Sequence, residues 1–354
     1  MMPAELRVAL IGYGYWGPNL ARNLVALPGV RLVRVCELDP ARRAQAQHLY
    51  PWIEAGDGAA AVCADQNVDA VVIATPLATH FPVALAALDA RKHVLVEKPI
   101  AATAGQARQL IEAARRQQRV LMVDHPFVYA APVRHLGELI ARGELGRLLH
   151  YDSVRANLGP FHSDVDVIWD LAAHDLSILE RLTGRQPFEV SAIGAGNGHP
   201  QDPEIAHLML RYDDGLLAHL HLSWLSPVKI RRTTLVGTRA LVMYDALNAA
   251  EQLRIYAGES PAGETPHAAT QQGSTRGAPT QQQRRIGYRL GDMISPRLPV
   301  EEPLQAMCAH FVECVRSGVT ALTDGGAGLR VVTVLEAARH SLALGGTSVA
   351  VQRE

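Results

Sequence analysis

The amino-acid sequence predicts an α/β protein in which a doubly wound parallel sheet is followed by a second, α+β domain with a large, mostly antiparallel open sheet. The first observation is length: 354 residues, at about 150 residues per domain, suggest two domains. The second is that short, continuous apolar runs alternate with helical patterns as far as Val123, as is typical of parallel strands covered on both faces. The third is the change after Val123 to helices followed by alternating strands. We therefore expect a first domain over residues 1–125 and a second over residues 126–354.

The elements of the first domain follow from its apolar runs. Between the first two runs, Leu20, Leu24 and Leu27 recur at helical spacing and predict a helix with one apolar face. A later helix is expected to begin after Thr103, because Thr103 and Gln106 have the spacing of a capping box. The runs that predict strands span residues 8–11, 32–36, 70–74, 94–96 and 120–123.

In the second domain, alternating segments on either side of Asp213, Asp214 and Gly215 predict a β-hairpin. One face of the resulting sheet is expected to be too large for its own helices to cover. This favours a homodimer or homotetramer that assembles through the C-terminal sheet. The expected strands span residues 204–212, 216–224, 229–236 and 241–244, with a short one near Val349, and the expected helices span residues 133–141, 170–182, 303–317 and 326–344.

The segment over residues 258–299 is rich in Gly, Pro, Gln, Thr and Ser. Such a composition buries too little apolar area to offset the entropy of ordering the chain. We expect a flexible excursion that is mobile, or that becomes ordered only against substrate or a neighbouring subunit.

Composition excludes several classes of protein. Lys and Arg total 34 and Asp and Glu total 35, so no net field attracts nucleic acid or an anionic membrane. No stretch approaches the roughly 20 apolar residues that span a bilayer. The four cysteines lack the paired spacing of a zinc site, and the 15 histidines are scattered without acidic company. We expect a cytoplasmic protein with reduced thiols and no metal, nucleic-acid or membrane partner.

The first predicted strand is followed directly by Gly12-Tyr13-Gly14-Tyr15-Trp16-Gly17, which opens the first helix. Glycines at this spacing, between a strand and a helix, are typical of a Rossmann dinucleotide-binding domain. They allow a tight turn and a close approach to a pyrophosphate, whose charge meets the free N–H groups of the helix. We expect Gly12, Gly14, Tyr15, Trp16 and Gly17 to bind the cofactor; the alternative is an ordinary glycine turn.

Glu37 ends the second predicted strand, 20 residues beyond Gly17. A carboxylate at this position would hydrogen-bond the adenosine ribose hydroxyls and repel the 2′-phosphate of NADP. No Arg or Lys follows within two positions. The sequence therefore predicts NAD as the cofactor.

Two further segments follow strands of the same sheet. In an open parallel sheet, ligands bind beyond the carboxyl ends of the strands, so Thr75, His80 and Glu97 are expected to line the cofactor cleft. Lys98 lies beside them, and its cation would stabilise an alkoxide that forms as a hydroxyl loses its proton. The alternative for Lys98 is a solvated surface lysine.

Asp170 and His174 are one helical turn apart near the start of a predicted helix and share one face. The imidazole can accept a proton from a substrate hydroxyl, and the carboxylate can orient it and share its charge. The alternative is that Asp170 caps the helix and His174 is a packed core residue.

These motifs, in this order and spacing, resemble those of the Gfo/Idh/MocA oxidoreductases, and the resemblance covers nearly the whole chain. It implies an NAD(P)-dependent sugar or polyol dehydrogenase with a Rossmann domain and an open-sheet C-terminal domain. The catalytic Lys, Asp and His of the family correspond to Lys98, Asp170 and His174. The resemblance also implies a cis peptide bond between Lys98 and Pro99.

Within this family, GYWGPNL at residues 14–20, NLG at 157–159 and WDLAAHD at 169–175 are similar to a bacterial subgroup linked to nucleotide-sugar 3-dehydrogenation. The chain departs from it at two places. Subgroup members commonly show Gly-His where this chain has Asp124-His125, and Tyr-Asn-Pro where it has Tyr129-Ala130-Ala131-Pro132. A contact to the substrate is therefore expected to differ.

The second domain offers further candidates. His125, Tyr129, Arg155 and Asn157 are expected near the cleft as substrate-binding residues, with core packing as the alternative. Lys229 and Arg231 alternate onto one face of a strand while Arg232 takes the other, so the first two could meet a diphosphate or simply be solvated.

The expected reaction transfers a hydride between a secondary hydroxyl of a sugar, most specifically C3 of a nucleotide sugar, and the nicotinamide of NAD. His174 would take the hydroxyl proton, Lys98 would stabilise the alkoxide and Asp170 would orient the pair. The alternatives are a free monosaccharide or inositol dehydrogenase, a ketosugar reductase and, outside enzymes, an NAD-binding regulator.

Overall fold

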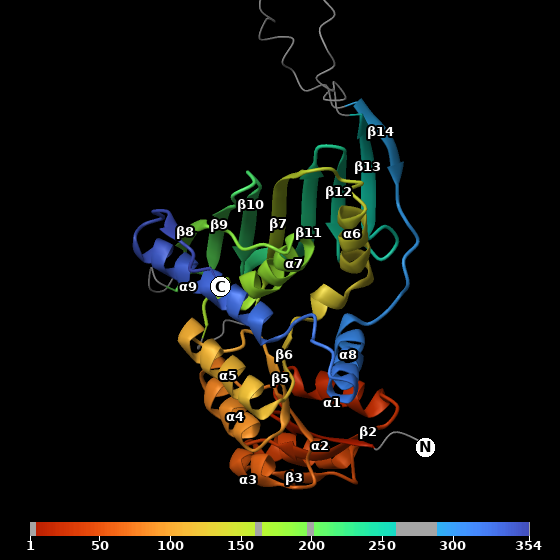
Figure 1. Ribbon diagram of the computed structural model, residues 1–354, viewed down its shortest axis with the longest axis vertical. Coiled ribbons are helices and arrows are strands. Elements are labelled where there is room, and N and C mark those ends of the chain that lie inside the picture. The colour runs from red at the N-terminus through yellow and green to blue at the C-terminus, as the bar shows by residue number, and fades with distance from the viewer. Residues whose placement is uncertain (1–4, 160–164, 197–201, 260–288, 354) are drawn as a thin grey trace, which may run out of the picture.

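The computed structural model describes residues 5–159, 165–196, 202–259 and 289–353. It contains a parallel six-stranded sheet and a nine-stranded, mostly antiparallel sheet, which form the lower and upper parts of the view in Figure 1. The predicted fold class, an α/β Rossmann domain followed by an α+β domain, is confirmed.

The first sheet has the strand order β3-β2-β1-β4-β5-β6, and all its described pairs are parallel. Because the order reverses between β1 and β4, a cleft opens beyond their carboxyl ends. The helix begins after Thr103 as predicted, because the Thr103 hydroxyl accepts a hydrogen bond from the Gln106 N–H at 3.1 Å; the Gln106 side chain accepts from the Ala102 N–H at 3.2 Å and not from that of Thr103. The elements are β1 (Leu6–Ile11), α1 (Gly17–Ala26), β2 (Val30–Cys36), α2 (Pro40–Leu49), β3 (Glu54–Gly56), α3 (Ala59–Ala64), β4 (Ala70–Ile73), α4 (Leu77–Asp89), β5 (His93–Glu97), α5 (Ala104–Gln117) and β6 (Leu121–Asp124).

The second sheet has the order β14-β13-β12-β11-β7-β10-β9-β8-β15, with β7 and β10 as a parallel pair. The predicted hairpin joins β9 to β10, and Gly215 in its turn has φ +84°. Figure 1 shows α6, α7 and α9 on one face of this sheet. The elements are η1 (Pro126–Tyr129), α6 (Ala131–Ala141), β7 (Leu148–Leu158), η2 (Ile168–Ala172), α7 (Ala173–Thr183), β8 (Glu189–Ala195), β9 (Ile205–Arg211), β10 (Leu217–Ser223), β11 (Leu225–Gly237), β12 (Ala240–Asp245), β13 (Leu253–Glu259), β14 (Arg289–Ile294), α8 (Pro303–Ser317), α9 (Gly325–Ala343) and β15 (Val349–Ala350).

The predicted excursion over residues 258–299 needs correction at both ends. Residues 258 and 259 still belong to β13, which ends at Glu259. Arg289–Ile294 forms β14, an edge strand that pairs with β13. The composition of the segment does not predict this strand. An edge strand is held by backbone hydrogen bonds and needs little apolar side-chain area. Residues 260–288 of the excursion lie outside the described residues.

The C-terminal part of the chain returns to the first domain, which the sequence did not indicate. Helix α8 packs beside α1, and Leu304, Met307 and Phe311 join a buried core with Leu10 and Leu95 of the six-stranded sheet. Figure 1 shows α8 beside α1 at the side of that sheet. One face of the first sheet is therefore completed by residues far beyond position 125.

The far edge of the six-stranded sheet is also covered by returning chain. The Val123 N–H donates to the Thr323 carbonyl at 2.7 Å, and Met122 forms a bridge with Asp324. A Cβ added to Gly328 in α9 would lie 2.7 Å from Cγ2 of Val123, so this glycine allows the helix to approach β6 closely. The C-terminal part of the chain therefore completes the first domain at two places: α8 packs beside α1, and the segment that leads into α9 packs beside β6.

We expect Phe311→Ala to lower the free energy of unfolding by about 3–5 kcal/mol, because the ring is fully buried and its loss leaves a cavity. Denaturant unfolding followed by circular dichroism measures the change. Gln305→Ala, at an exposed position of the same helix, is the matched control. Equal stability of the two variants would contradict a structural role for α8 in the first domain.

Candidate active site

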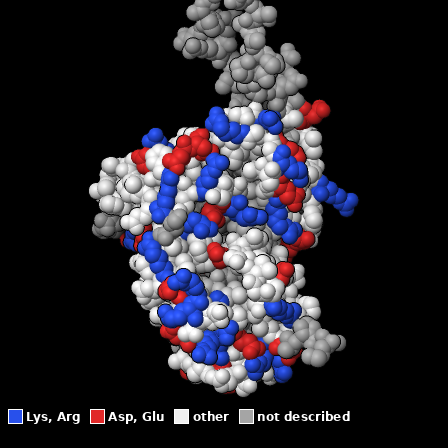
Figure 2. Space-filling model, in the orientation of Figure 1, with Lys and Arg blue, Asp and Glu red and all other residues white. Residues whose placement is uncertain are grey.

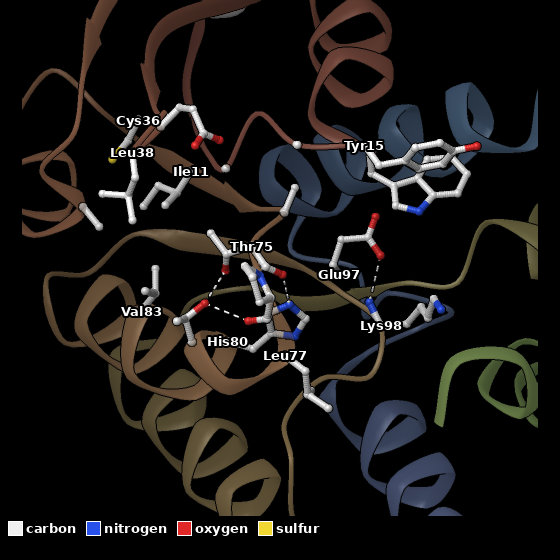
Figure 3. Close-up of a pocket in the computed structure, with 18 of the residues that line it drawn as sticks. Ile11, Tyr15, Cys36, Leu38, Thr75, Leu77, His80, Val83, Glu97 and Lys98 are labelled. Atoms are coloured by element: carbon white, nitrogen blue, oxygen red, sulfur yellow. Dashed lines mark hydrogen bonds between the residues drawn. The ribbon is translucent and has the colours of Figure 1, made fainter. Parts of the chain in front are cut away.

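A cavity of about 550 Å³ lies beyond the carboxyl ends of the first sheet. Figure 3 shows Cys36 and Leu38 at one end of it and Tyr15, Glu97 and Lys98 at the other. All the predicted cofactor-binding residues except Gly17 line it: Gly12, Gly14, Tyr15, Trp16, Glu37, Thr75, His80, Glu97 and Lys98. Val165, Trp169 and Asp170 close it from the second domain.

The glycine-rich turn has the backbone that a dinucleotide site requires. Gly12 has φ +96°, and a Cβ there would lie 2.3 Å from the Ala74 carbonyl oxygen. A Cβ on Gly17 would lie 2.7 Å from the Gly12 carbonyl oxygen. Helix α1 begins at Gly17 without a side-chain cap, so N–H groups of its first turn remain available to an anion. The turn therefore fits a pyrophosphate.

Glu37 is held by backbone N–H groups at the edge of the cavity. One carboxylate oxygen accepts from the Tyr13 N–H at 2.6 Å and the other from the Asp39 N–H at 2.9 Å. Each oxygen keeps a second lone pair for a ribose hydroxyl. Arg42 also lines the cavity, with its guanidinium 3.5 Å from a Cβ added to Gly14. Arg42 is not predicted from the sequence, because it lies five residues after Glu37 and not within the two positions that follow it.

His80 connects the two loops that border the middle of the cavity. It is buried, its Nδ1 lies 2.8 Å from the Pro99 carbonyl oxygen, and its Nε2 lies 2.8 Å from the Thr75 carbonyl oxygen. The Thr79 hydroxyl donates to that of Thr75 at 2.7 Å. Through these two contacts His80 holds the loop after β4 against the loop after β5 (Figure 3).

Lys98 and Asp170 form an ion pair between the two domains. The Lys98 ammonium lies 2.8 Å from Oδ1 of Asp170 and 2.8 Å from the Asp170 carbonyl oxygen. The Trp224 indole N–H donates to Asp170 Oδ2 at 3.1 Å. The side chain of Lys98 is 10% exposed, so the alternative of a solvated surface lysine is wrong. The Lys98–Pro99 peptide bond is cis, as the resemblance implied.

The predicted helix around Asp170 and His174 begins as a π-helical turn, η2, and becomes α-helical at Ala173. A spacing of four residues places two side chains on one face only in a regular α-helix. The hydrogen bonds described for the Asp170 carboxylate come from Lys98 and Trp224, and His174 Nδ1 has no hydrogen-bond partner among the described residues. Asp170 therefore fixes Lys98 directly, a contact that the spacing did not predict.

His174 lies near this ion pair and packs edge-on against Phe127, with ring centroids 4.9 Å apart. Burial, and then the cations Lys98 and Arg155, hold the pKa of His174 well below its usual range. The imidazole is therefore neutral at physiological pH and keeps a free lone pair for a proton, while the lowered pKa makes it a weaker base than a solvated histidine.

The structure does not place the first two predicted substrate residues at the cavity. Tyr129 belongs to the core beneath α8, where its hydroxyl lies 3.0 Å from His310 Nδ1 and 3.3 Å from the Thr323 hydroxyl. His125 is 1% exposed, and burial followed by the Lys98 charge lowers its pKa to about 3. For Tyr129, the core alternative describes the observed contacts.

Arg155 and Asn157 lie on β7 and are held by neighbouring side chains. Arg155 forms a buried, two-bond ion pair with Asp175, with both N···O distances at 2.9 Å. Asn157 accepts a hydrogen bond from Arg231, whose guanidinium also donates to the Ala156 carbonyl at 2.9 Å. Burial, and then the charge of Arg155, lower the pKa of Arg231 to about 10. Lys229 is exposed, and so is Arg232 on the opposite face of the strand.

The part of the chain that the structure describes offers no site of two other kinds. There, no three His, Cys, Asp or Glu side chains are grouped so that they could hold a metal ion, and no helix is long and apolar enough to cross a membrane. Figure 2 shows acidic and basic side chains interspersed on the described part of the face in view.

A Rossmann domain whose cavity ends at a buried lysine defines a nicotinamide-dependent oxidoreductase. Residues 6–125 match the oxidoreductase family with an NAD-binding Rossmann fold, and residues 133–243 match the GFO/IDH/MocA C-terminal domain. The chain belongs to the Gfo/Idh/MocA oxidoreductase family, whose members are NAD(P)-dependent dehydrogenases acting on CH–OH groups.

Named relatives are similar over most of the chain. The uncharacterized oxidoreductase YdgJ of Escherichia coli is 30% identical over 268 residues, which cover 73% of this chain and 76% of the relative. UDP-N-acetylglucosamine 3-dehydrogenase of Acidithiobacillus ferrooxidans is 29% identical over 259 residues, covering 71% and 77%. A solved structure of this dehydrogenase, GnnA, has a TM-score of 0.78 at 25% identity and covers 96% of this chain and 98% of its own. Inositol 2-dehydrogenase 2 of Saccharopolyspora erythraea is 29% identical over 224 residues, covering 61% and 66%.

Proposed function

We propose that this protein is an NAD-dependent sugar dehydrogenase that oxidises a secondary hydroxyl, at C3 of a nucleotide sugar, or catalyses the reverse reduction. The observation that carries the proposal is the Lys98–Asp170 ion pair, which ends the cavity that the glycine-rich turn lines, beside a neutral His174. The relative that acts on UDP-N-acetylglucosamine supports the nucleotide-sugar assignment.

The three side chains divide the proton chemistry between them. His174, which is neutral, accepts the hydroxyl proton as general base. The Lys98 ammonium stabilises the negative charge that develops on the same oxygen. Asp170 holds Lys98 in place through a 2.8 Å contact and is itself fixed by Trp224. NAD bound along Gly12, Gly14 and Glu37 would supply the acceptor for the hydride.

A free monosaccharide or inositol dehydrogenase is the second candidate, and one observation favours it. Of the cations that could meet a diphosphate, Arg155 is neutralised by Asp175, and Arg231 donates to Asn157 and to backbone carbonyls. Lys229, which is exposed, remains for a diphosphate in this part of the described chain. A non-catalytic NAD-binding regulator is disfavoured because Lys98, Asp170 and His174 lie together near one end of the cavity.

A panel of nucleotide sugars and free sugars, assayed by the absorbance of reduced nicotinamide, tests the proposal. Keto-sugar acceptors belong in the panel because a tightly retained cofactor would mask turnover. We expect the highest kcat/KM with a nucleotide sugar, and turnover of that substrate should fall by orders of magnitude with Lys98→Ala. Higher kcat/KM with free sugars would select the second candidate, and turnover of none would support the regulator.

We expect NAD to bind more tightly than NADP, because Glu37 would place a like charge against the 2′-phosphate. Calorimetric titration of both cofactors with the parent and with Glu37→Gln measures the preference. Arg42→Ala is the informative companion, since Arg42 is a cation on the same cavity wall and its loss should weaken NADP further. Equal affinity of the parent for the two cofactors would refute the role of Glu37.

We also propose that a second copy of the chain covers the open face of the nine-stranded sheet. Apolar side chains on this face remain exposed, among them Ile193, Met209 and Leu217. Leu217→Asp is expected to convert an oligomer into a monomer by light scattering, because it places a charge in an apolar contact. Leu49→Asp, on the first domain, is the matched control. A monomeric parent would overturn this assembly.

A further inference from the structure

Glu97 and Asp124 form a buried pair of carboxyl groups at the end of the cavity occupied by Lys98. They face each other in register at the ends of the adjacent strands β5 and β6, and they are 8% and 3% exposed. Their side chains lie within hydrogen-bonding reach of each other. Because ionised carboxylates are acceptors only, this contact requires a proton between them.

The surroundings supply too little positive charge for two ionised carboxylates. Lys98 is the cation that acts on both groups, and its ammonium already pairs with Asp170 at 2.8 Å. His125, beside Asp124, is kept neutral by burial, which lowers its pKa to about 3. A second ionised carboxylate would therefore be buried without a counterion.

The negative charge of Asp170, in η2, raises the pKa of Glu97. Two further titratable groups that act on the pair belong to η1 and α8. They are Tyr129 and Cys308, and burial raises the pKa of both. Both are therefore neutral at physiological pH and offer no positive charge to the carboxyls. The charge of the pair depends on its own proton.

The contacts indicate which carboxyl group carries the proton. The backbone N–H of Lys98 donates a hydrogen bond to Oε2 of Glu97 at 3.1 Å, and this bond stabilises the ionised form of Glu97. Oδ2 of Asp124 is buried without a hydrogen-bond partner among the described residues. An oxygen without a partner costs less on a neutral carboxyl group than on a carboxylate. Burial raises the pKa of both groups, and the adjacent Glu97 raises that of Asp124 further.

We propose that Glu97 and Asp124 share one proton, held on Asp124, so that the pair carries a single negative charge beside Lys98. Asp124 is then a positioning residue: while it stays protonated, no second carboxylate competes with Asp170 for the Lys98 ammonium. The kinetic consequence rests on the proposed function, whereas the protonation state of the pair does not.

Infrared spectroscopy of the whole protein tests the protonation state without a substrate. The parent at pH 7 is expected to show the C=O stretch of a protonated carboxyl group. Asp124→Asn and Glu97→Gln should each remove this band, because the amide replaces the shared proton as the hydrogen-bond donor. Asp166→Asn, at another buried acid whose pKa burial raises, should leave it in place. No such band in the parent would overturn the proposal, and this measurement does not depend on whether the variants fold.

The pH dependence of kcat distinguishes a shared proton from the other charge states. In the parent, the alkaline limb is expected to include loss of the shared proton, which creates the second carboxylate. Asp124→Asn has no such proton to lose and stays at one negative charge, so its alkaline limb should move to higher pH by about one unit or more. In the double variant Glu97→Gln/Asp124→Asn the negative charge of the pair beside the Lys98 ammonium is gone, and the limb should move to lower pH. If the alkaline limb moved to lower pH in both variants, Glu97 and Asp124 would both be ionised in the parent. If it moved in neither variant, both would be protonated. Either result overturns the proposal. If no sugar is turned over, the proposed function fails while the infrared result still decides the charge of the pair.

Discussion

Lys98→Ala and His174→Ala are expected to lower turnover by roughly a hundredfold to ten-thousandfold each, the range typical of a lost proton-transfer or charge-stabilising group. Lys98 is the ammonium that ends the cavity, and His174 is the neutral base near it. Steady-state kinetics on the best substrate of the panel measures both losses. NAD affinity of His174→Ala should stay near that of the parent, because His174 is not among the residues that line the cavity.

Asp170→Asn is the graded companion to these two variants. It keeps the shape that accepts the Trp224 indole N–H at 3.1 Å but removes the charge that pairs with Lys98. We expect a smaller loss of turnover together with a shift in the pH dependence of the rate. Full activity in His174→Ala would return that histidine to a packing role and leave Lys98 as the proton-handling group.

Gly12→Ala is expected to weaken NAD binding by roughly tenfold to a hundredfold even where the fold survives. The backbone at φ +96° is strained for any residue with a Cβ, at about 1–3 kcal/mol, and the added carbon would lie 2.3 Å from the Ala74 carbonyl oxygen. Fluorescence titration with reduced nicotinamide cofactor measures the affinity, and thermal unfolding measures the stability.

Gly56→Ala is the matched control for this substitution. Gly56 ends a strand of the same sheet, but a Cβ added there would meet no described atom within 4 Å. We expect it to leave both cofactor affinity and stability close to those of the parent. Gly12→Ala with the same affinity as the control would contradict the assignment of the glycine-rich turn to the cofactor.

The fold and one wall of the cavity could be predicted because local patterns determine them. Buried parallel strands produce continuous apolar runs, and a dinucleotide turn requires glycine at fixed positions such as Gly12. The carboxyl ends of neighbouring strands meet at one edge of the sheet, so Thr75 and Lys98 could be placed in one cleft from their positions alone.

Contacts between distant segments could not be predicted, because no local pattern encodes them. The Trp224 indole that fixes Asp170 comes from the end of β10, and nothing in its surrounding sequence indicates that partner. The π-helical turn of η2 has the same apolar spacing as an ordinary helix. The burial of Tyr129 cannot be predicted from its surroundings in the sequence, because α8, which buries it, follows much later in the chain.

The return of α8 to the first domain has a consequence for synthesis of the chain on the ribosome. When residue 125 has emerged, the face of the sheet that carries Leu10 and Leu95 lacks its cover, since Leu304 and Phe311 are still to be translated. At about 5–20 residues per second, the roughly 190 residues up to the end of α8 take on the order of 10–40 s. During that interval the nascent nucleotide-binding half presents apolar surface to chaperones, and its folding is completed only when the last part of the message has been read.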